Sequence, residues 1–504
     1  MVSEGLLPFH YEEQRVPGSM TALAGLPAYF ALAVVAGVRE SLVRHLGARS
    51  DGQGWTDAQV VLALMLVNLV GGDSVEDLAR LEGDEGLCRV MRQIEHHGLP
   101  RKERRALERR WRKERMRAFP SVSAARRCLA AQHNEAAEAG RVAGEAFIPE
   151  RLESVRGLSR ANADLVAFVQ AKRPCDVATL DMDATLVETH KQEALYCYKK
   201  FKAYQPLNTW WAEQQLVLHS EFRDGNVPAG FEQLRVFEEA LGYLPAGVET
   251  VRTRSDTAGY QWDWLRYCEE GRHPRFGRIE FAVGVDITDA FRQAITTTPD
   301  LRWQPVDDDS GQEWAEVCFA PQAMQRTLKG AYRFIAVRDP VRQMELFPDT
   351  EQLSFPTLRS QDEAGRTLLW KLTAVVTNRM EMDAVAVIHW YRGRCGKSEE
   401  AHSIMKEDLA GGHLPSKRFG ANAAWWLVMI LAMNLHAAMK LLVLGESWVP
   451  RRMKAVRLWF ITVPALVISH ARTLTLRLGA HAASARLLIE AHARIAELAR
   501  GPAG

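Results

Sequence analysis

The spacing of hydrophobic residues changes several times along the chain, and its first part is typical of helices. Across residues 20–81, apolar residues recur every three or four positions. The run TDAQVVLALMLVNL begins at Thr56, a favoured N-cap residue, and the pair Gly71-Gly72 follows it closely. These signals predict a helical N-terminal region over residues 1–150.

From residue 177 the pattern becomes typical of β-strands. Helical spacing returns at 229–242 and 258–270, between the later strand segments. The order of elements is therefore strand, strand, strand, helix, strand, helix, strand, which predicts an α/β fold with a mixed sheet flanked by helices. The strand segments, rich in β-branched and aromatic residues, are VATLDMDATLV (177–187), TWWAEQQLVLHSEF (209–222), VETVRTRSD (248–256) and RIEFAVGVD (278–286).

Two further changes of pattern divide the rest of the chain. Segments such as YRFIAVRDPVR and TLLWKLTAVVTN have strand patterns separated by loops, whereas the chain from Met382 onward is almost wholly helical in pattern. We therefore predict five regions. They are a helical N-terminal region (1–150), an α/β core in two parts (151–300 and 376–445), a β-rich insertion (301–375) and a helical C-terminal tail (446–504).

Charge is balanced overall but concentrated locally. The formal net charge is only +2, from 64 Lys and Arg against 62 Asp and Glu, so a basic surface requires local segregation. The segment RKERRALERRWRKERMR (101–117) provides it, with ten Lys or Arg against three Glu. A phosphate-contacting helix through Arg104, Arg105, Arg109 and Arg112 is one interpretation. A solvated helix face is the other.

Cysteine usage indicates a reducing compartment, and the lengths of the apolar runs argue against a membrane span. The seven cysteines are scattered and include no CxxC pair, which argues against a structural zinc site. No signal peptide is visible at the N-terminus. The apolar runs at 28–38 and 423–433 are each about eleven residues, shorter than the roughly twenty that span a bilayer. We expect them to be buried helices, with no membrane contact.

The stretch LDMDATLV (180–187) places two aspartates on one strand face inside an apolar run. It resembles the haloacid dehalogenase-type phosphohydrolases, in which Asp-x-Asp-x-Thr ends a strand. That resemblance implies Asp181 as a nucleophile and Asp183 as an acid/base. The segment GVDITD (284–289) is similar to a later acidic motif of that family. The family's lysine and small-residue motifs have no counterpart here.

A second motif lies in YRGRCGKSEEAHSIMKEDL (391–409). Glu399 and Lys406 are seven residues apart, so they share a helix face with His402 between them. A metal-bound phosphodiester is a partner that suits both a carboxylate and a cation. Together with LDMDATLV, THKQEALYCYKKFKAYQPL, FRDGN, RTRSD and FGANAAWWLVMILAMNL, this segment resembles the DDE transposases of bacterial insertion sequences, in the group with a Tyr-Arg-Glu-Lys signature.

The resemblance implies an RNase H-like fold and a site of three acidic residues. Asp183, Asp256 and Glu399 would hold two Mg²⁺ ions, with Mn²⁺ as a substitute. Asp181 is the reserve for the first aspartate. Asp256 precedes Thr-Ala-Gly, so a structural N-cap is its alternative role.

The same resemblance implies residues that contact DNA. Tyr391, Arg394 and Lys406 would hold phosphates that flank the cleaved bond, and Lys200 follows the first strand. Four residues separate Arg394 from Glu399, where the group usually has three. Arg392 or Lys397 therefore remains an alternative for the arginine's role.

The tryptophans of the insertion have two interpretations. Trp303, Trp314 or Trp370 could stack on a base flipped out of a hairpin end. Packing in the core of the insertion is the commoner role of tryptophan in such a segment.

The function predicted from these residues is cut-and-paste DNA transposition. The expected partners are double-stranded DNA, as terminal inverted repeats and target, and a second copy of the chain in a synaptic homodimer. The expected location is the bacterial cytoplasm, at the nucleoid. The alternatives are the phosphohydrolase that uses Asp181 and Asp183, and a DNA-binding relic without catalysis.

Overall fold

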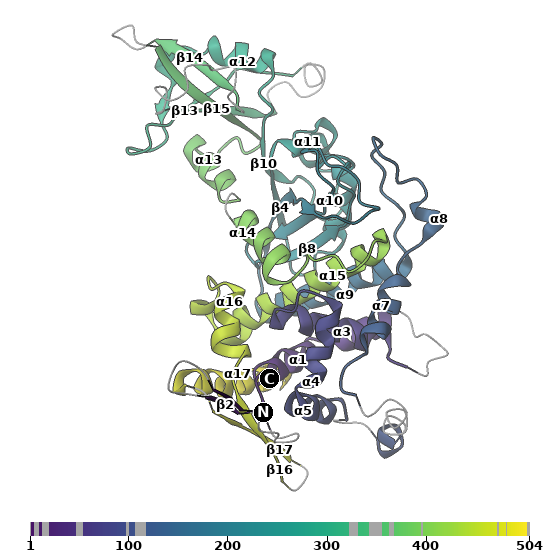
Figure 1. The fold of residues 1–504 in the computed structure, drawn as a ribbon. Coiled ribbons are helices and arrows are strands. Elements are labelled where there is room, and N and C mark those ends of the chain that lie inside the picture. Colours follow the sequence, from purple (N-terminus) through teal and green to yellow (C-terminus); the bar gives the residue numbers. More distant parts are fainter. Residues whose placement is uncertain are drawn as a thin grey trace.

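The computed structural model of the chain centres on one large mixed sheet (Figure 1). It describes residues 2–4, 10–12, 20–46, 54–96, 100–105, 117–321, 331–341, 355–361, 367–394, 397–470, 473–479 and 481–500. The sheet has ten strands in the order β11-β12-β13-β15-β10-β9-β4-β7-β8, and β14 pairs with β15 beside this path. The core strands are β4 (Val177–Ala184), β7 (Leu207–Trp211), β8 (Leu216–Glu221), β9 (Thr250–Ser255) and β10 (Glu280–Gly284).

The strand β4 lies at the centre of the core half of the sheet. On one side β7 pairs antiparallel with β4, and β8 pairs antiparallel with β7. On the other side β9 pairs parallel with β4, and β10 pairs parallel with β9. This is the expected RNase H-like mixed sheet, and α10 (Gln233–Gly242) and α11 (Trp262–Glu269) lie at the predicted places. Because β4 and β9 are parallel neighbours, their C-terminal ends meet at one edge of the sheet.

The β-rich insertion extends the core sheet and does not form a separate one. Strand β15 (Thr367–Thr377) pairs antiparallel with β10, and Val283 is opposite Val376. The predicted boundary at residue 375 therefore falls inside a strand of the shared sheet. In Figure 1 the strands β13 to β15 lie at the end of the molecule opposite the termini. The other elements of this part are α12 (Asp289–Thr296), β11 (Gln304–Pro305), β12 (Glu313–Glu316), β13 (Arg333–Pro340) and β14 (Thr357–Gln361).

Two long helices pack against the sheet at β8. The helices α9 (Glu153–Lys172) and α15 (Phe419–Ala438) pack against each other and against β8. Asn162 of α9 donates to the Val217 carbonyl at 2.9 Å, and the side-chain oxygen of Asn434 accepts from the Val217 amide at 2.9 Å. These bonds satisfy polar groups that helix packing takes away from water.

The helix α15 is longer and more apolar than its sequence run indicates. Every residue of α15 is buried. With the π-helical turn that continues it, Phe419–Leu444 is long and apolar enough to cross a membrane, although 83% of its most apolar window is buried inside the protein. The prediction of an eleven-residue run was thus too short, but the expected burial is confirmed. A helix that is apolar on all sides needs neighbours on all sides, and the sheet, α9 and the N-terminal helices supply them.

The N-terminal region is helical, as predicted. The hydroxyl oxygen of Thr56 accepts from the Gln59 amide and caps α3, and Gly71 ends this helix with a φ of 91°. Arg104 and Arg105 lie in the exposed helical residues 101–105. Arg109 and Arg112 lie outside the described residues. The helices are α1 (Leu26–Val35), α2 (Val38–Leu46), α3 (Asp57–Val70), α4 (Leu78–Gly83), α5 (Glu85–His96), α7 (Val122–Ala130) and α8 (Glu135–Glu138).

The C-terminal tail is not wholly helical, so this part of the prediction is wrong. After α16 (Met453–Val456) the chain forms a hairpin of β16 (Ala465–His470) and β17 (Thr473–Leu478) before α17 (Ala482–Arg500). Strand β17 (TLTLRL) alternates polar and apolar residues, the pattern of a half-buried strand, whereas β16 (ALVISH) begins with four apolar residues. Strand β16 also pairs with β3 (Met20–Thr21), and the two termini lie close together in Figure 1. The pairing partner lies more than 440 residues away in sequence, so no local pattern indicates it.

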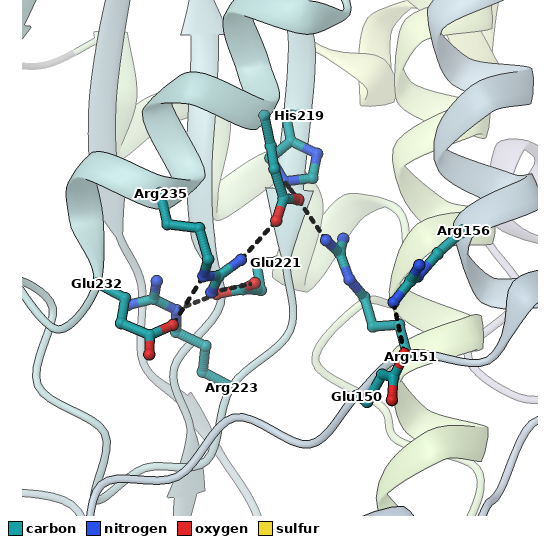
Figure 2. Close-up of polar contacts among 9 residues, drawn as sticks. Glu150, Arg151, Arg156, His219, Glu221, Arg223, Glu232 and Arg235 are labelled. Atoms are coloured by element: carbon teal, nitrogen blue, oxygen red, sulfur yellow. Dashed lines mark hydrogen bonds and ion pairs between the residues drawn. The ribbon is translucent and has the colours of Figure 1, made fainter.

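A charged cluster joins α10 to β8 and to the segment before α9 (Figure 2). The buried carboxylate of Glu221 accepts from Arg223 Nε and from Arg235 Nη2, each at 2.8 Å. Glu239 accepts from Arg235 and from Arg151. Burial alone would raise the pKa of Glu221, but the arginines around it hold that pKa below its ordinary value. The cluster fixes α10 on the outer strand.

The FRDGN stretch (222–226) ties the N-terminal region to the core. Asp224 accepts from Arg141 through both oxygens, at 2.7 and 2.9 Å, and both side chains are buried. Asn226 donates to the carbonyls of Val142 and Glu145, at 3.1 and 2.6 Å. The loop after β8 and the segment after α8 therefore hold each other in place.

We predict that Asp224→Asn lowers the free energy of unfolding by about 3 kcal/mol, because it leaves the Arg141 guanidinium buried without its anion. The measurement is the urea midpoint at neutral pH. The matched control is Glu150→Gln, which breaks the exposed pair of Glu150 and Arg156 at 3.0 Å. That change should cost less than about 1 kcal/mol. Equal shifts for the two variants would contradict the structural role of Asp224.

Candidate catalytic centre

Two of the predicted acidic residues lie side by side at the edge where β4 and β9 end. Met182 of β4 is in register with Ser255 of β9. Asp183 and Asp256 are the next residues along these two strands, so they end neighbouring strands about 4.8 Å apart. Asp256 also caps the short turn Thr257–Gly259, because its Oδ1 accepts from the Ala258 amide at 3.0 Å. The alternative role of N-cap is thus observed, and it orients the carboxylate.

The reserve candidate, Asp181, is held in a buried ion pair. Its two oxygens accept from Arg254 Nε and Nη2 at 2.6 and 2.7 Å. Asp181 and Arg254 are register partners. Each lies two residues before the candidate aspartate, Asp183 or Asp256, and side chains two residues apart on a strand share one face of the sheet. Arg254 also donates to the Trp390 carbonyl at 2.5 Å, at the end of α13 (Ala384–Arg392). Asp181 therefore fixes α13 on the sheet, a structural role that leaves Asp183 as the better candidate.

The end of α13 carries two predicted DNA-binding residues to the aspartates. Arg394 Nη1 lies 3.4 Å from Asp183 Oδ2. Burial would lower the pKa of Arg394, but Tyr391, Asp183 and Asp256 hold that pKa above its ordinary value. Arg394 therefore faces both aspartates despite its irregular spacing from Glu399.

The absence of a side chain at Gly284 of β10 makes room for Tyr391. A Cβ at Gly284 would lie 2.7 Å from the Tyr391 hydroxyl and 3.3 Å from the Asp256 carbonyl carbon. Both distances are closer than ordinary contact. A glycine is therefore required where Tyr391 meets the Asp256 turn.

A chain of buried polar contacts fixes α14 (Lys397–Ser403) beside Asp183. Asn208 of β7 is the register partner of Asp183, and its Nδ2 lies 3.3 Å from His402 Nε2. Ser220 of β8 donates to Asn208 at 2.7 Å, and Trp426 of α15 donates to Ser220 at 2.8 Å. The helix that carries Glu399 is therefore attached to the sheet one strand away from Asp183.

Lys406, which follows this helix, reaches the same sheet edge. Lys406 Nζ donates to the Leu186 carbonyl at 3.3 Å, two residues beyond the end of β4. Lys406 lies in a π-helical turn, Ile404–Asp408, that follows α14 directly. Such turns are frequent at functional sites.

The third acidic residue does not join the other two. Glu399 is exposed on α14. Across the described part of the chain, no three His, Cys, Asp or Glu side chains form a group that could hold a metal ion. The two strand-end carboxylates nevertheless suit a divalent cation, which prefers oxygen ligands. The position beside Asp183 already accepts a positive charge, the Arg394 guanidinium.

Comparison with known proteins decides the family. The family model described as "Transposase DDE domain group 1" matches residues 18–500. The chain belongs to the DDE transposases. Members of this family act on DNA and use a divalent metal, so this chain is a DNA transposase, a nuclease and strand transferase. The haloacid dehalogenase alternative is thereby excluded.

The other comparisons add a structural likeness. Among solved structures, the transposase is similar to the cryo-EM structure of the piggyBac transposase synaptic complex with hairpin DNA, with a TM-score of 0.40 and 9% identity. The match covers 81% of this chain and 74% of that chain. No curated protein matches the chain.

The tryptophans of the insertion pack around an arginine. The Arg338 guanidinium lies 4.3 Å from the ring centre of Trp303 and 4.6 Å from that of Trp370. Trp370 also donates to Ser360 at 2.8 Å. These contacts favour the structural interpretation of both tryptophans in this transposase.

The residues that the sequence analysis missed are those that position others. The pairing of Arg254 could have been predicted from the sequence. The segment Asp-x-Asp on β4 and the segment Arg-x-Asp on β9 have the same spacing, so parallel pairing that brings the two second aspartates together also places Asp181 opposite Arg254. The roles of Asn208 and Gly284 could not be predicted, since they depend on helices packed against the sheet.

We predict that His402 makes the transposase less stable in acid. Burial, with the charges of Lys406 and Arg394, lowers the pKa of His402 to about 4, whereas an unfolded histidine titrates near 6.5. The unfolded state therefore binds more protons between these values, and stability falls as the pH drops from about 6.5 to 4. The loss attributable to His402 should approach about 3 kcal/mol.

The measurement is urea unfolding of the DNA-free protein from pH 7 to 4. His402→Gln, which keeps a polar group near Asn208, should flatten this dependence. His413→Gln, at an exposed histidine nearby, should leave the dependence unchanged. A His402→Gln profile parallel to that of the unsubstituted protein would refute the assignment.

Proposed function

We propose that Asp183, Asp256 and Glu399 are the catalytic acidic residues of this transposase and hold two Mg²⁺ ions, with Mn²⁺ as a substitute. The observation that carries the proposal is the shared position of Asp183 and Asp256 at the ends of β4 and β9. The attachment of α14 beside Asp183 through His402 supports the choice of Glu399. Glu399 lies one turn before His402, so a modest adjustment of α14 on DNA binding would complete the site.

The chemistry to be catalysed is in-line displacement at a phosphodiester. When bound, the metal ions activate the attacking oxygen and stabilise the leaving oxygen. Asp256 is oriented by its bond to the Ala258 amide. Asp183 is placed by strand pairing on both sides, with β7 and with β9. Such fixed positions reduce the reorganisation that the transition state would otherwise require.

The cations around these carboxylates would hold the DNA. Arg394, beside Asp183, is within reach of a phosphate at the strand ends. Tyr391 and Lys406 lie at the same edge. A longer contact with the transposon end would involve Lys200 and the basic segment 101–117, through Arg104, Arg105, Arg109 and Arg112.

The reaction we infer is cut-and-paste transposition. The substrates would be double-stranded DNA with terminal inverted repeats and a target duplex, and a homodimer would bring two ends together. Action on chromosomal DNA would place the protein in the bacterial cytoplasm, at the nucleoid. In this division of labour the N-terminal region (1–150) would bind the ends, and the two parts of the core would cut them.

We predict that Asp183→Asn, Asp256→Asn and Glu399→Gln each reduce Mg²⁺-dependent cleavage at least about 100-fold, because each removes an anionic metal ligand. The substrate is DNA that carries the inverted repeats flanking the gene. Cleavage is followed on sequencing gels, and binding by gel shift should persist in every variant.

Glu400→Gln is the matched control, because Glu400 is the exposed neighbour of Glu399 on α14. It should cleave normally. Normal cleavage by Glu399→Gln together with loss in Glu400→Gln would move the third acidic role to Glu400. Binding without cleavage by the unsubstituted protein, in Mg²⁺ and in Mn²⁺, would identify a relic that binds DNA only.

A further inference from the structure

A hollow of about 500 Å³ opens beside the catalytic edge. Its volume is within the range of sites that enclose one small ligand, about 300–1,000 Å³. Asp256 and Ala184, the neighbour of Asp183, line it. The rest of its wall comes from two loops, with Tyr196, Cys197, Tyr198 and Gln205 on one and Gly225, Asn226, Val227, Pro228 and Ala229 on the other.

Two exposed tyrosines stand at this hollow. The side chains of Tyr196 and Tyr198 are 62% and 72% exposed. Tyr196 pairs with Lys202 at the base of a short hairpin and Tyr198 lies in its turn, and both residues line the hollow. Two aromatic rings left in water contribute little to folding, and a stacking partner would bury them.

The same hairpin presents positive charge around the rings. Lys199 Nζ lies 5.8 Å from the ring centre of Tyr198, and Lys202 Nζ lies 5.9 Å from that of Tyr196. Aromatic rings interleaved with lysines are the combination that binds single-stranded nucleic acid, in which bases stack and phosphates need cations.

The tip of the hairpin carries a lysine in an unusual backbone conformation. The Cys197 amide donates to the Phe201 carbonyl, and the Lys200 amide donates to the Cys197 carbonyl, both at 2.9 Å. Lys200 has a φ of 66°, in the left-handed region that hairpin loops of this length usually fill with glycine. An exposed lysine at this position points to a use for its charge.

The opposite wall of the hollow is rigid. The buried pair of Asp224 with Arg141 and the bonds of Asn226 to Val142 and Glu145 hold the loop. Gly225 fits against the Ala203 carbonyl, where a Cβ would lie only 2.5 Å from that oxygen. A preformed wall loses little entropy when a ligand binds.

We propose that this hollow binds an unpaired nucleotide next to the scissile phosphate, with its base stacked on Tyr196 and Tyr198 and its phosphate near Lys200. The proposal rests on the catalytic role proposed for Asp256, because that residue lines the hollow. A volume of about 500 Å³ is within the range that encloses one nucleotide. On this proposal the DNA at the cleavage position is frayed or single-stranded when its base enters the hollow.

The test is fluorescence anisotropy with a labelled oligothymidylate and with a duplex of equal length, both in EDTA. Tyr196→Ala combined with Tyr198→Ala should weaken oligothymidylate binding about tenfold or more and leave duplex binding unchanged. Tyr196→Phe with Tyr198→Phe should retain the affinity, because the rings remain. Trp459→Ala, which removes a partly exposed aromatic ring elsewhere, is the control.

A substitution at Lys200 separates charge from structure. Lys200→Gly relaxes the backbone, so thermal stability should be equal or higher, whereas oligothymidylate affinity should fall several-fold. A loss of single-strand and duplex binding to the same extent, or no loss in the double alanine variant, would overturn the proposal. EDTA prevents cleavage, so these results are independent of whether the acidic residues catalyse it.

A second readout reports on stacking itself. With 2-aminopurine within the oligothymidylate, binding should quench its fluorescence through ring contact, and the double alanine variant should lose this quenching while the double phenylalanine variant keeps it. Unquenched fluorescence in the unsubstituted complex would exclude a stacked base.

Discussion

The ion pair between Asp181 and Arg254 joins three elements at the end of the sheet where chemistry is proposed. It connects β4 to β9 within the sheet, and the further bond of Arg254 to the Trp390 carbonyl connects both strands to α13. Because the pair is buried, removing either partner would leave an uncompensated charge, a change that typically costs about 3–5 kcal/mol. The register that this pair fixes places Asp183 and Asp256 directly after the paired residues Met182 and Ser255, and the helix end that it holds brings Arg394 to Asp183.

The acidic residues are positioned by two different kinds of structure. Asp183 is fixed by backbone pairing of β4, which resists displacement, and Asp256 by its position directly after β9 and its bond to the Ala258 amide. Glu399 depends on a helix that the buried chain from Trp426 through Ser220 and Asn208 to His402 holds in place. A helix attached by side chains can adjust more easily than a strand in mid-sheet. This difference agrees with the exposed position of Glu399 on α14.

The same division explains what the sequence could predict. The succession of strands and helices along the core and the N-cap at Thr56 follow from local patterns, and both are present. The motif around Asp183 and the resemblance to the family could also be recognised from the sequence. The hairpin β16-β17 against β3 could not, because its partner is remote in sequence. Nor could the continuation of the core sheet through β15, since a strand pattern does not reveal which neighbour the strand will pair with.

Charge placement connects the catalytic edge to the rest of the molecule. A chain with a net charge of +2 has no general attraction for DNA. Its cations must therefore stand where phosphates are to be held, beside carboxylates that would otherwise repel them. Arg394 neutralises Asp183 from above the sheet, and the lysines of the 196–202 hairpin border the hollow next to Asp256. On the proposed assignment, the carboxylates at the strand ends would attract metal ions, and the surrounding cations would offset the repulsion of the DNA backbone.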